Sequence, residues 1–171
     1  YQVDCLIFAT GFEVGTDYAR RCGYEIYGST GESLSDKWAD GARTFHGMHV
    51  HNFPNCFMMG HTQTGFTANY PHALNEQSQH IGYIINQLMA GNQKVVEASE
   101  EAEEEWVQTI ISLARSNEKF QADCTPGYYN NEGQPEGRSL QNANYGKGSP
   151  AFFKVLDEWR KEGLMKGLEV R

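Results

Sequence analysis

The stretch from Asp4 to Phe12 constrains the fold more than any other. It reads Asp-Cys-Leu-Ile-Phe-Ala-Thr-Gly-Phe, a short apolar run that follows an acid and ends at a small-Thr-Gly turn. The apolar positions fit a short strand that is buried on both faces, and Gly11 permits a sharp exit in which no side chain blocks a ligand. This pattern is typical of the ligand edge of a nucleotide-binding α/β sheet, and it also fits an ordinary buried strand that ends at a glycine. The apolar positions of the expected strand are Val3, Leu6, Ile7 and Phe8.

Three long helices are expected further along the chain. The clearest has apolar residues at helical spacing through Ala90, with Asn69 or Tyr70 as its cap, Pro71 in its first turn and Gly91 as its stop. A second helix should follow Ser99, and a third should run from Ser149 and Pro150 to Gly163. We also expect a short helix that begins at Ser33 or Ser35.

Short strands and loops should fill the rest. Strands are expected over residues 24–27 and 56–59, and a strand or bend over 94–96. Residues 120–148 should form a long loop region, and residues 164–171 should trail off with at most one short turn.

Composition narrows the classes of partner. The chain has 171 residues and a formal net charge of −8, and six glutamates lie between Glu97 and Glu105, most simply as the solvated start of a helix. This acidic balance disfavours nucleic acid as a partner. No apolar run approaches the roughly 18 residues of a membrane span. The four cysteines form no CxxC pair, which favours reduced thiols in a cytoplasmic protein.

Four stretches resemble a known family, in the family's own order. Asp4 to Phe12 closely resembles the Asp-x-x-(Ile/Val)-x-Ala-Thr-Gly-(Phe/Tyr) signature of flavin-containing monooxygenases and their Baeyer–Villiger relatives. The run Phe53-Pro54-Asn55-x-Phe57-x-x-Gly60 is similar to the last strand of the family's FAD domain, and the loop from His61 leads into the Pro71 helix as the family's does. The fourth, Cys124-Thr-Pro-Gly-Tyr-Tyr, resembles Baeyer–Villiger enzymes that take bulky ketones.

The resemblance implies an α/β fold: the C-terminal part of a Rossmann-like FAD-binding domain, with short strands, about three main helices and long loops. Residues 1–91 would be the C-terminal portion of that domain, and residues 92–171 a helical and loop extension that packs on it. The chain starts with Tyr1 rather than Met, and its first strand begins within three residues. We therefore expect a piece of a longer polypeptide, whose upstream part is its partner.

The implied activity is that of an FAD- and NADPH-dependent monooxygenase, which inserts one oxygen atom of O2 into a ketone to give an ester or lactone. The family's glycine-rich fingerprints and its active-site arginine and acid would lie upstream, so no catalytic residue is assigned here. By itself the chain should be inactive and should bind FAD weakly or not at all.

The candidate site is the loop from Gly60 into the Pro71 helix, where backbone N–H groups and the positive end of the helix dipole converge. Without the resemblance, a plain strand-loop-helix connection fits this loop, and a structural turn fits Thr10 and Gly11. With it, the expected cofactor-binding residues are Thr10, Gly11, Gly60, Asn69 and Tyr70. The residues expected to border the substrate pocket are Gly65, Phe66, Thr67 and Ala68. Relatives carry a Trp before a Gly-Ala-Asn stretch on a loop that closes over NADP, whereas residues 139–145 here contain no Trp.

Three other motifs carry little weight. Residues 146–151 fit GxGxxA, but no strand is expected before them and too few residues follow for a βαβ unit. His49, His51 and His61 lack a further set of ligands that would complete a zinc site, so no metal is expected. No cysteine has surroundings that indicate an activated thiolate.

Two alternatives remain. One is a flavin monooxygenase that oxidises nitrogen or sulfur substrates, since these enzymes share the Ala-Thr-Gly strand. The other is a non-catalytic module that self-associates through an unpaired sheet edge. The assembly state of a monooxygenase stays open, and a homo-oligomer is compatible with it.

Overall fold

The computed structural model describes residues 2–8, 18–114 and 140–171. These fall into two compact units, each described here by itself. Of the described residues, the first unit contains 2–8 and 18–24, and the second contains 25–114 and 140–171. None of the helices in these ranges, α3 included, is both long and apolar enough to cross a membrane.

The opening strand predicted from the sequence is not present in the first unit. Residues 2–8 form neither strand nor helix, and the four apolar side chains expected inside are 64% to 81% exposed. The prediction was wrong for a physical reason: an apolar run becomes a buried strand only when a neighbouring strand pairs with its backbone, and none of the described residues does so. The unit's one described helix is α1 (Tyr18–Cys22). Thr10 and Gly11 lie outside the described residues.

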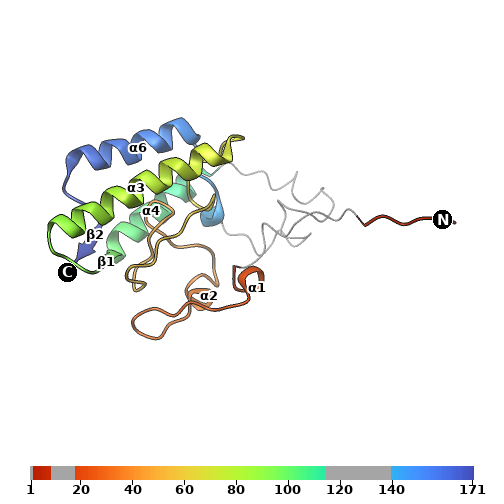
Figure 1. The fold of residues 1–171 in the computed structure, drawn as a ribbon, viewed down its shortest axis with the longest axis horizontal. Helices are drawn as coiled ribbons and strands as arrows, with labels where there is room; N and C mark the ends of the chain where they lie inside the picture. The colour runs from red at the N-terminus through yellow and green to blue at the C-terminus, as the bar shows by residue number, and fades with distance from the viewer. Residues whose placement is uncertain (1, 9–17, 115–139) are drawn as a thin grey trace. The chain divides into compact units, whose positions relative to one another are not determined.

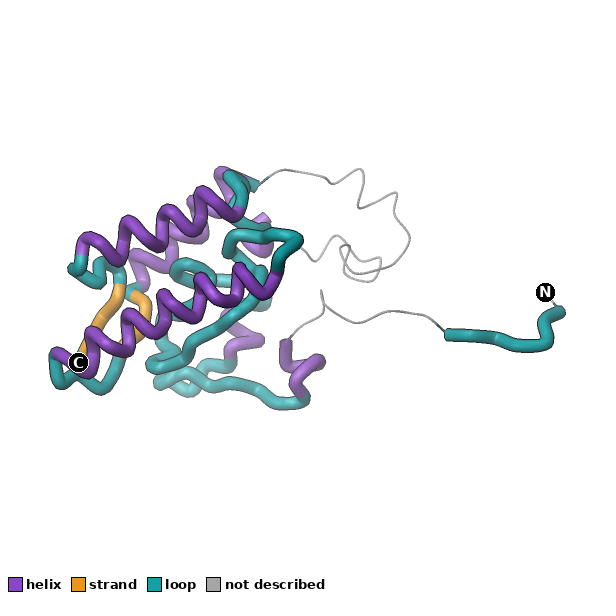
Figure 2. Tube along the Cα trace, turned by 45° about the horizontal axis from the view of Figure 1, so that its top comes forward, coloured by secondary structure: helices purple, strands orange, loops and turns teal. Residues whose placement is uncertain are grey.

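The second unit contains the expected helices, and their predicted caps are confirmed. The 21-residue α3 (Tyr70–Ala90) is capped by Asn69 and ends at Gly91, and α4 (Glu100–Leu113) is capped by Ser99. The elements that complete the helical set are α2 (Leu34–Lys37), η3 (Leu140–Asn142) and α6 (Ser149–Glu162). Helices α3 and α6 run side by side in both views (Figures 1 and 2).

A two-stranded antiparallel sheet is the only sheet that the described residues form. Strand β1 (Val96–Ala98) pairs with β2 (Leu168–Val170), with Val96 opposite Val170. The tail that was expected to trail off therefore contains a strand. The sequence did not indicate it because its partner strand lies about 70 residues away and leaves no local signal. The strands predicted over 24–27 and 56–59 do not form: the first contributes one bridge, from Tyr27 to Ser33, and the second is irregular.

The fold class is thus confirmed only in outline. The unit combines helices with a small sheet, and no parallel Rossmann-like sheet occurs within the described ranges. The helices formed where the sequence predicted them because their caps and apolar spacing are local features. A parallel sheet depends instead on strands that come from distant parts of a chain.

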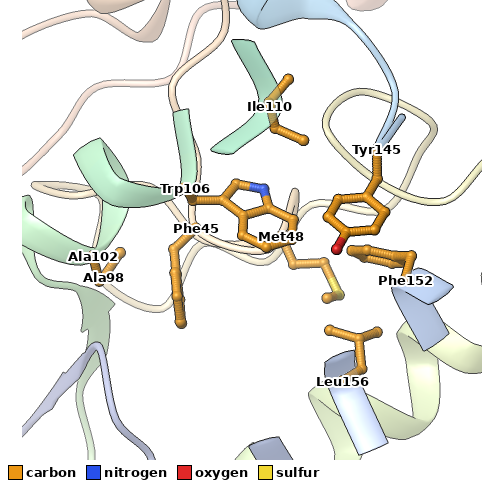
Figure 3. Close-up of a cluster of buried hydrophobic side chains, with 9 residues drawn as sticks. All are labelled: Phe45, Met48, Ala98, Ala102, Trp106, Ile110, Tyr145, Phe152 and Leu156. Carbon is orange, nitrogen blue, oxygen red and sulfur yellow. The ribbon is translucent and has the colours of Figure 1, made fainter. Parts of the chain in front are cut away.

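The core of the second unit centres on Trp106 of α4 (Figure 3). The ring of Tyr145 stacks on it, with ring centroids 5.6 Å apart and planes 3° from parallel. Its indole N–H donates to the Gln63 carbonyl at 3.2 Å, which satisfies its one polar atom. The side chains that Figure 3 shows around it are Phe45, Met48, Ala98, Ala102, Ile110, Tyr145, Phe152 and Leu156.

Two members of this core, Phe45 and Met48, come from residues 42–65, which form no helix and only one bridge, between Phe45 and His49. Several of their backbone groups are paired by side chains from other elements. The Glu103 carboxylate accepts from the His51 N–H at 2.8 Å, and the Glu97 carboxylate accepts from the Asn52 N–H at 3.1 Å. Side-chain acceptors thus replace the ladder that a strand would have provided.

The sequence suggested that the acidic run is simply the solvated start of a helix. The structure shows that part of this run is buried. Glu100, Glu101 and Glu105 are exposed, but Glu103 is only 1% exposed, and Glu97 is also buried. A buried carboxylate requires charged partners and hydrogen bonds. Glu103 has both, since Lys37 Nζ lies 3.0 Å and Arg43 Nε 3.4 Å from its Oε2.

Neutralising Glu103 should destabilise the second unit. We expect Glu103→Gln to lower the free energy of unfolding by about 3 kcal/mol, because the ammonium of Lys37 would remain largely buried without its counter-ion. The matched control is Glu101→Gln, an exposed glutamate on the same turn of α4, which should change stability by less than about 0.5 kcal/mol. Urea denaturation followed by circular dichroism measures both. Equal effects of the two substitutions would show that the Glu103 ion pairs contribute nothing.

Candidate functional site

The start of α3 is the structural centre of the candidate site. The Asn69 side chain accepts from the His72 N–H at 3.3 Å, and Pro71 occupies the first turn, where no backbone donor is needed. Thr67 Oγ1 accepts from the Asn69 N–H at 3.3 Å, which fixes the approach to the cap. No acidic residue lies in this first turn to offset the positive end of the dipole. The site therefore favours a ligand edge that carries negative charge.

The residues predicted to face a ligand differ in exposure. Tyr70 is 37% and Phe66 48% exposed, and Ala68 and Asn69 are also exposed. Gly65 is buried instead: a Cβ added there would lie 2.8 Å from the Cα of Ser149 and 3.0 Å from the Phe152 side chain. Gly65 thus brings the loop into close contact with α6.

Sequence reasoning missed the residue that closes this loop. Gln77 is fully buried on α3, and its amide forms two hydrogen bonds with the backbone of Gly60. Its Oε1 accepts from the Gly60 N–H at 2.9 Å, and its Nε2 donates to the Gly60 carbonyl at 2.7 Å. Thr64 Oγ1 donates to the same carbonyl at 2.9 Å. A glutamine among the inward-facing positions of an amphipathic helix was the available signal, because a buried amide needs partners.

A second missed residue, Gln63, joins three separate segments. Its Nε2 donates to the carbonyls of Ala42 at 2.8 Å and Gln141 at 2.7 Å, while its Oε1 accepts from the Thr44 hydroxyl. Its backbone N–H donates to the Ala143 carbonyl at 3.1 Å. Gln63 therefore fixes the start of the 61–69 loop to residues 141–143, which lie in the stretch where the sequence lacks the family's Trp.

The predicted site residues are only partly brought together. Gly60, Asn69 and Tyr70 lie at the two ends of the loop that Gln77 closes, and residues 65–68 lie within it. Because Thr10 and Gly11 lie outside the described residues, their expected position beside this loop stays a prediction. A Cβ added at Gly60 would meet no atom within 4 Å, so the space on that side of the backbone is open.

The motifs given little weight look ordinary in the structure. Gly148 precedes α6 with φ of 86°, and no strand leads into it from the described residues before it. Across the described ranges, no group of three His, Cys, Asp or Glu side chains is placed to hold a metal ion.

Comparison with known proteins identifies relatives along the whole chain. No family model matches. Neopentalenolactone D synthase of Streptomyces avermitilis is 48% identical over 100% of this chain and 29% of its own length. Pentalenolactone D synthase of Streptomyces exfoliatus is also 48% identical, over 100% of the chain and 30% of the relative. A Baeyer–Villiger monooxygenase of Stachybotrys chlorohalonatus is 34% identical over 99% of the chain and 27% of the relative.

Solved structures give the same result. The polycyclic ketone monooxygenase of Thermothelomyces thermophila matches 90% of this chain and 25% of its own, with a TM-score of 0.77 and 32% identity. A cyclohexanone monooxygenase from Rhodococcus bound to NADP+ matches 100% of this chain and 31% of its own, with a TM-score of 0.79 and 26% identity.

The fold is therefore that of one part of the ketone monooxygenases. More particularly, the chain is homologous over its whole length to one segment of the Baeyer–Villiger-type flavin monooxygenases, which confirms the resemblance found in the sequence. It spans about 30% of the length of the curated relatives that it matches.

Removing the Gln77 amide should loosen this loop. We expect Gln77→Leu to lower the free energy of unfolding by about 2 kcal/mol, because the Gly60 N–H loses its partner and the Gly60 carbonyl keeps only the Thr64 hydroxyl. Backbone amides of residues 60–69 should also exchange with solvent about tenfold faster. Gln87→Leu is the control, on an exposed position of the same helix, and should change neither quantity. Thermal unfolding and hydrogen exchange measure both; unchanged exchange in Gln77→Leu would contradict the role of Gln77.

Proposed function

We propose that the chain is part of an FAD- and NADPH-dependent Baeyer–Villiger monooxygenase, which inserts one oxygen atom of O2 into a ketone to give an ester or lactone. The observation that carries this proposal is the match of the chain to neopentalenolactone D synthase and pentalenolactone D synthase, at 48% identity over 100% of its length. Relatives named as Baeyer–Villiger monooxygenases at 34% identity support the same reaction. A relative named as an FAD-binding monooxygenase and a neighbour bound to NADP+ support the two cofactors.

The start of α3 fits the pyrimidine edge of a flavin ring. That edge carries partial negative charge, and the amide groups of the first helical turn provide a matching positive field. Asn69 and Tyr70 are exposed there, and the open side of Gly60 would let the backbone approach a flat ring. Bound FAD would supply the oxidation chemistry, while these residues would bind and orient it.

The loop before α3 fits the border of a ketone pocket. Phe66 and Ala68 present exposed apolar surface next to Thr67, and the contact of Gly65 with α6 holds this stretch in place. Apolar walls with few polar groups are the usual lining of a small-molecule site. We assign Gly65, Phe66, Thr67 and Ala68 to the substrate side of the site, and Thr10, Gly11, Gly60, Asn69 and Tyr70 to the cofactor side.

We further propose that upstream polypeptide supplies the sheet of the FAD-binding domain and completes the active site. Residues 2–8 present apolar side chains without a partner strand among the described residues, which suits a strand that joins a sheet supplied by other parts of the protein. A cytoplasmic location agrees with the free thiols of Cys5, Cys22 and Cys56.

The same exposed residues favour a second candidate, a non-catalytic module that self-associates. Val3, Leu6, Ile7 and Phe8 are apolar and 64% to 81% exposed, and such a segment can pair with a copy of itself. Light scattering measures whether the chain self-associates, and flavin absorbance of the full-length protein separates the candidates, because a non-catalytic module should bind no flavin.

The proposed reaction is tested by product analysis on the full-length enzyme. Supplied with NADPH, O2 and a cyclic ketone, it should release the lactone, whose added oxygen comes from labelled O2. A tertiary amine and a thioether are the comparison substrates. Oxidation of the amine or thioether with no lactone formed would replace the proposal with the nitrogen- or sulfur-oxidising alternative.

The chain by itself should not retain flavin. We expect the purified 171-residue chain to bind FAD weakly or not at all, because the resemblance places the glycine-rich FAD fingerprint upstream. Flavin absorbance after mixing with FAD and desalting measures this. A stoichiometric yellow protein would contradict the proposed division of the cofactor site.

A further inference from the structure

Three of the chain's six histidines are buried together in the second unit. His46 and His49 lie on the tight turn that the Phe45–His49 bridge closes, and His80 lies on α3. Their exposed fractions are 4%, 1% and 0%. The His80 ring centroid is 5.6 Å from that of His46 and 6.4 Å from that of His49. The cluster therefore lies where α3 packs against the 45–49 turn.

The cluster is packed as if its members were apolar. Phe45 stacks on His46 at 3.9 Å between ring centroids, Phe57 lies 5.4 Å from His49, and Trp159 of α6 lies 4.9 Å from His80. Among the described residues, no hydrogen-bond partner is placed for His46 Nδ1, His49 Nε2 or either ring nitrogen of His80. A neutral imidazole tolerates such a site far better than a cation does.

Within the described part of the chain, no opposite charge acts on these rings to compensate a proton. The charged group that acts on His80 is the Arg160 guanidinium of α6, which repels a second cation. The carboxylate of Asp157, which lies beside Arg160, is paired with Lys161 Nζ at 2.6 Å and Arg160 Nη2 at 3.8 Å. On the 45–49 turn and on α3, the titratable groups acting on the cluster are its own histidines.

The expected protonation follows from these surroundings. Burial lowers the pKa of His49 to about 4. Burial, with repulsion from His49 and Arg160, lowers the pKa of His80 to about 3. Burial, with repulsion from His80 and His49, holds the pKa of His46 well below its usual value. All three rings are therefore neutral in the folded chain at neutral pH.

We propose that His46, His49 and His80 form an acid-sensitive latch that holds α3 on the 45–49 turn and on α6. At neutral pH the uncharged rings pack as core side chains. At acidic pH a proton on these rings is incompatible with the buried, partner-free site. The contacts of α3 with the 45–49 turn and with α6 therefore open. The latch is independent of the proposed monooxygenase function, because it rests on packing within the second unit alone.

The sign of the pH dependence is fixed by the unfolded state. A histidine in an unfolded chain has a pKa of about 6.5, above the folded values, so the unfolded state binds more protons between those limits. The stability contributed by the neutral rings is complete above about pH 6.5 and is lost as the pH falls. For each unit by which the pH falls below about 6.5, each histidine should raise the unfolding equilibrium constant about tenfold, and the three together should raise it up to about 1,000-fold.

Urea denaturation of the chain at pH 7, 6 and 5 tests the latch. The unfolding equilibrium constant should rise steeply between pH 6 and pH 5, and His80→Phe should reduce that rise by about tenfold per pH unit. His72→Phe is the matched control, since it makes the same substitution at an exposed histidine of the same helix, and should keep the wild-type pH dependence. A flat wild-type profile, or the same slope in His80→Phe and the wild type, would overturn the proposal.

A measurement on the unaltered chain covers the case in which His80→Phe does not fold. Imidazole NMR signals of the folded chain should show three histidines that stay neutral down to pH 5, or until the chain unfolds. Titration of His46, His49 or His80 near pH 6.5 in the folded chain would overturn the proposal.

Discussion

The second unit depends on how a buried segment without regular secondary structure satisfies its backbone. Residues 42–65 supply core side chains such as Met48, Val50 and Phe53, yet they form only one bridge. Buried N–H and carbonyl groups must be paired, and a segment that lacks a ladder must find partners elsewhere. Side chains of α3, α4 and β1 provide several of them, which explains why glutamates and a glutamine are buried in this unit.

This arrangement also positions the candidate site. Glu103 and Glu97 hold the middle of the segment, while Gln77 holds its end at Gly60. The loop that follows is therefore fixed at Gly60 and at the Asn69 cap, and it presents Phe66 and Tyr70 between rigid supports. A site built in this way can hold a ligand with little loss of conformational freedom on binding. The three neutral histidines pack where α3 contacts the 45–49 turn, and this packing links the position of α3 to pH.

Local signals in the sequence predicted the helices well. Asn69, Ser99, Gly91 and Gly163 marked helix boundaries because caps and stops act within one turn. The partners of Glu103 and Gln77 could not be predicted in the same way, because they are distant in sequence. The β1–β2 pairing was missed for the same reason, because its two strands are far apart in sequence. The prediction of a strand in the opening stretch was wrong for a related reason. Its strand pattern specifies an apolar surface but not the neighbour that must cover it. The four stretches that resemble the family, taken together in order, nevertheless identified it.

The central claim is that the start of α3 faces the flavin. A crystal structure of the full-length protein with FAD bound tests it most directly. We predict that the backbone N–H of Tyr70, which the Asn69 cap does not hold, lies within hydrogen-bond distance, about 3 Å, of the pyrimidine edge of the ring. We also predict that Thr10 and Gly60 border the same cavity. An FAD ring bound elsewhere, with the start of α3 facing solvent or another part of the protein, would contradict this claim.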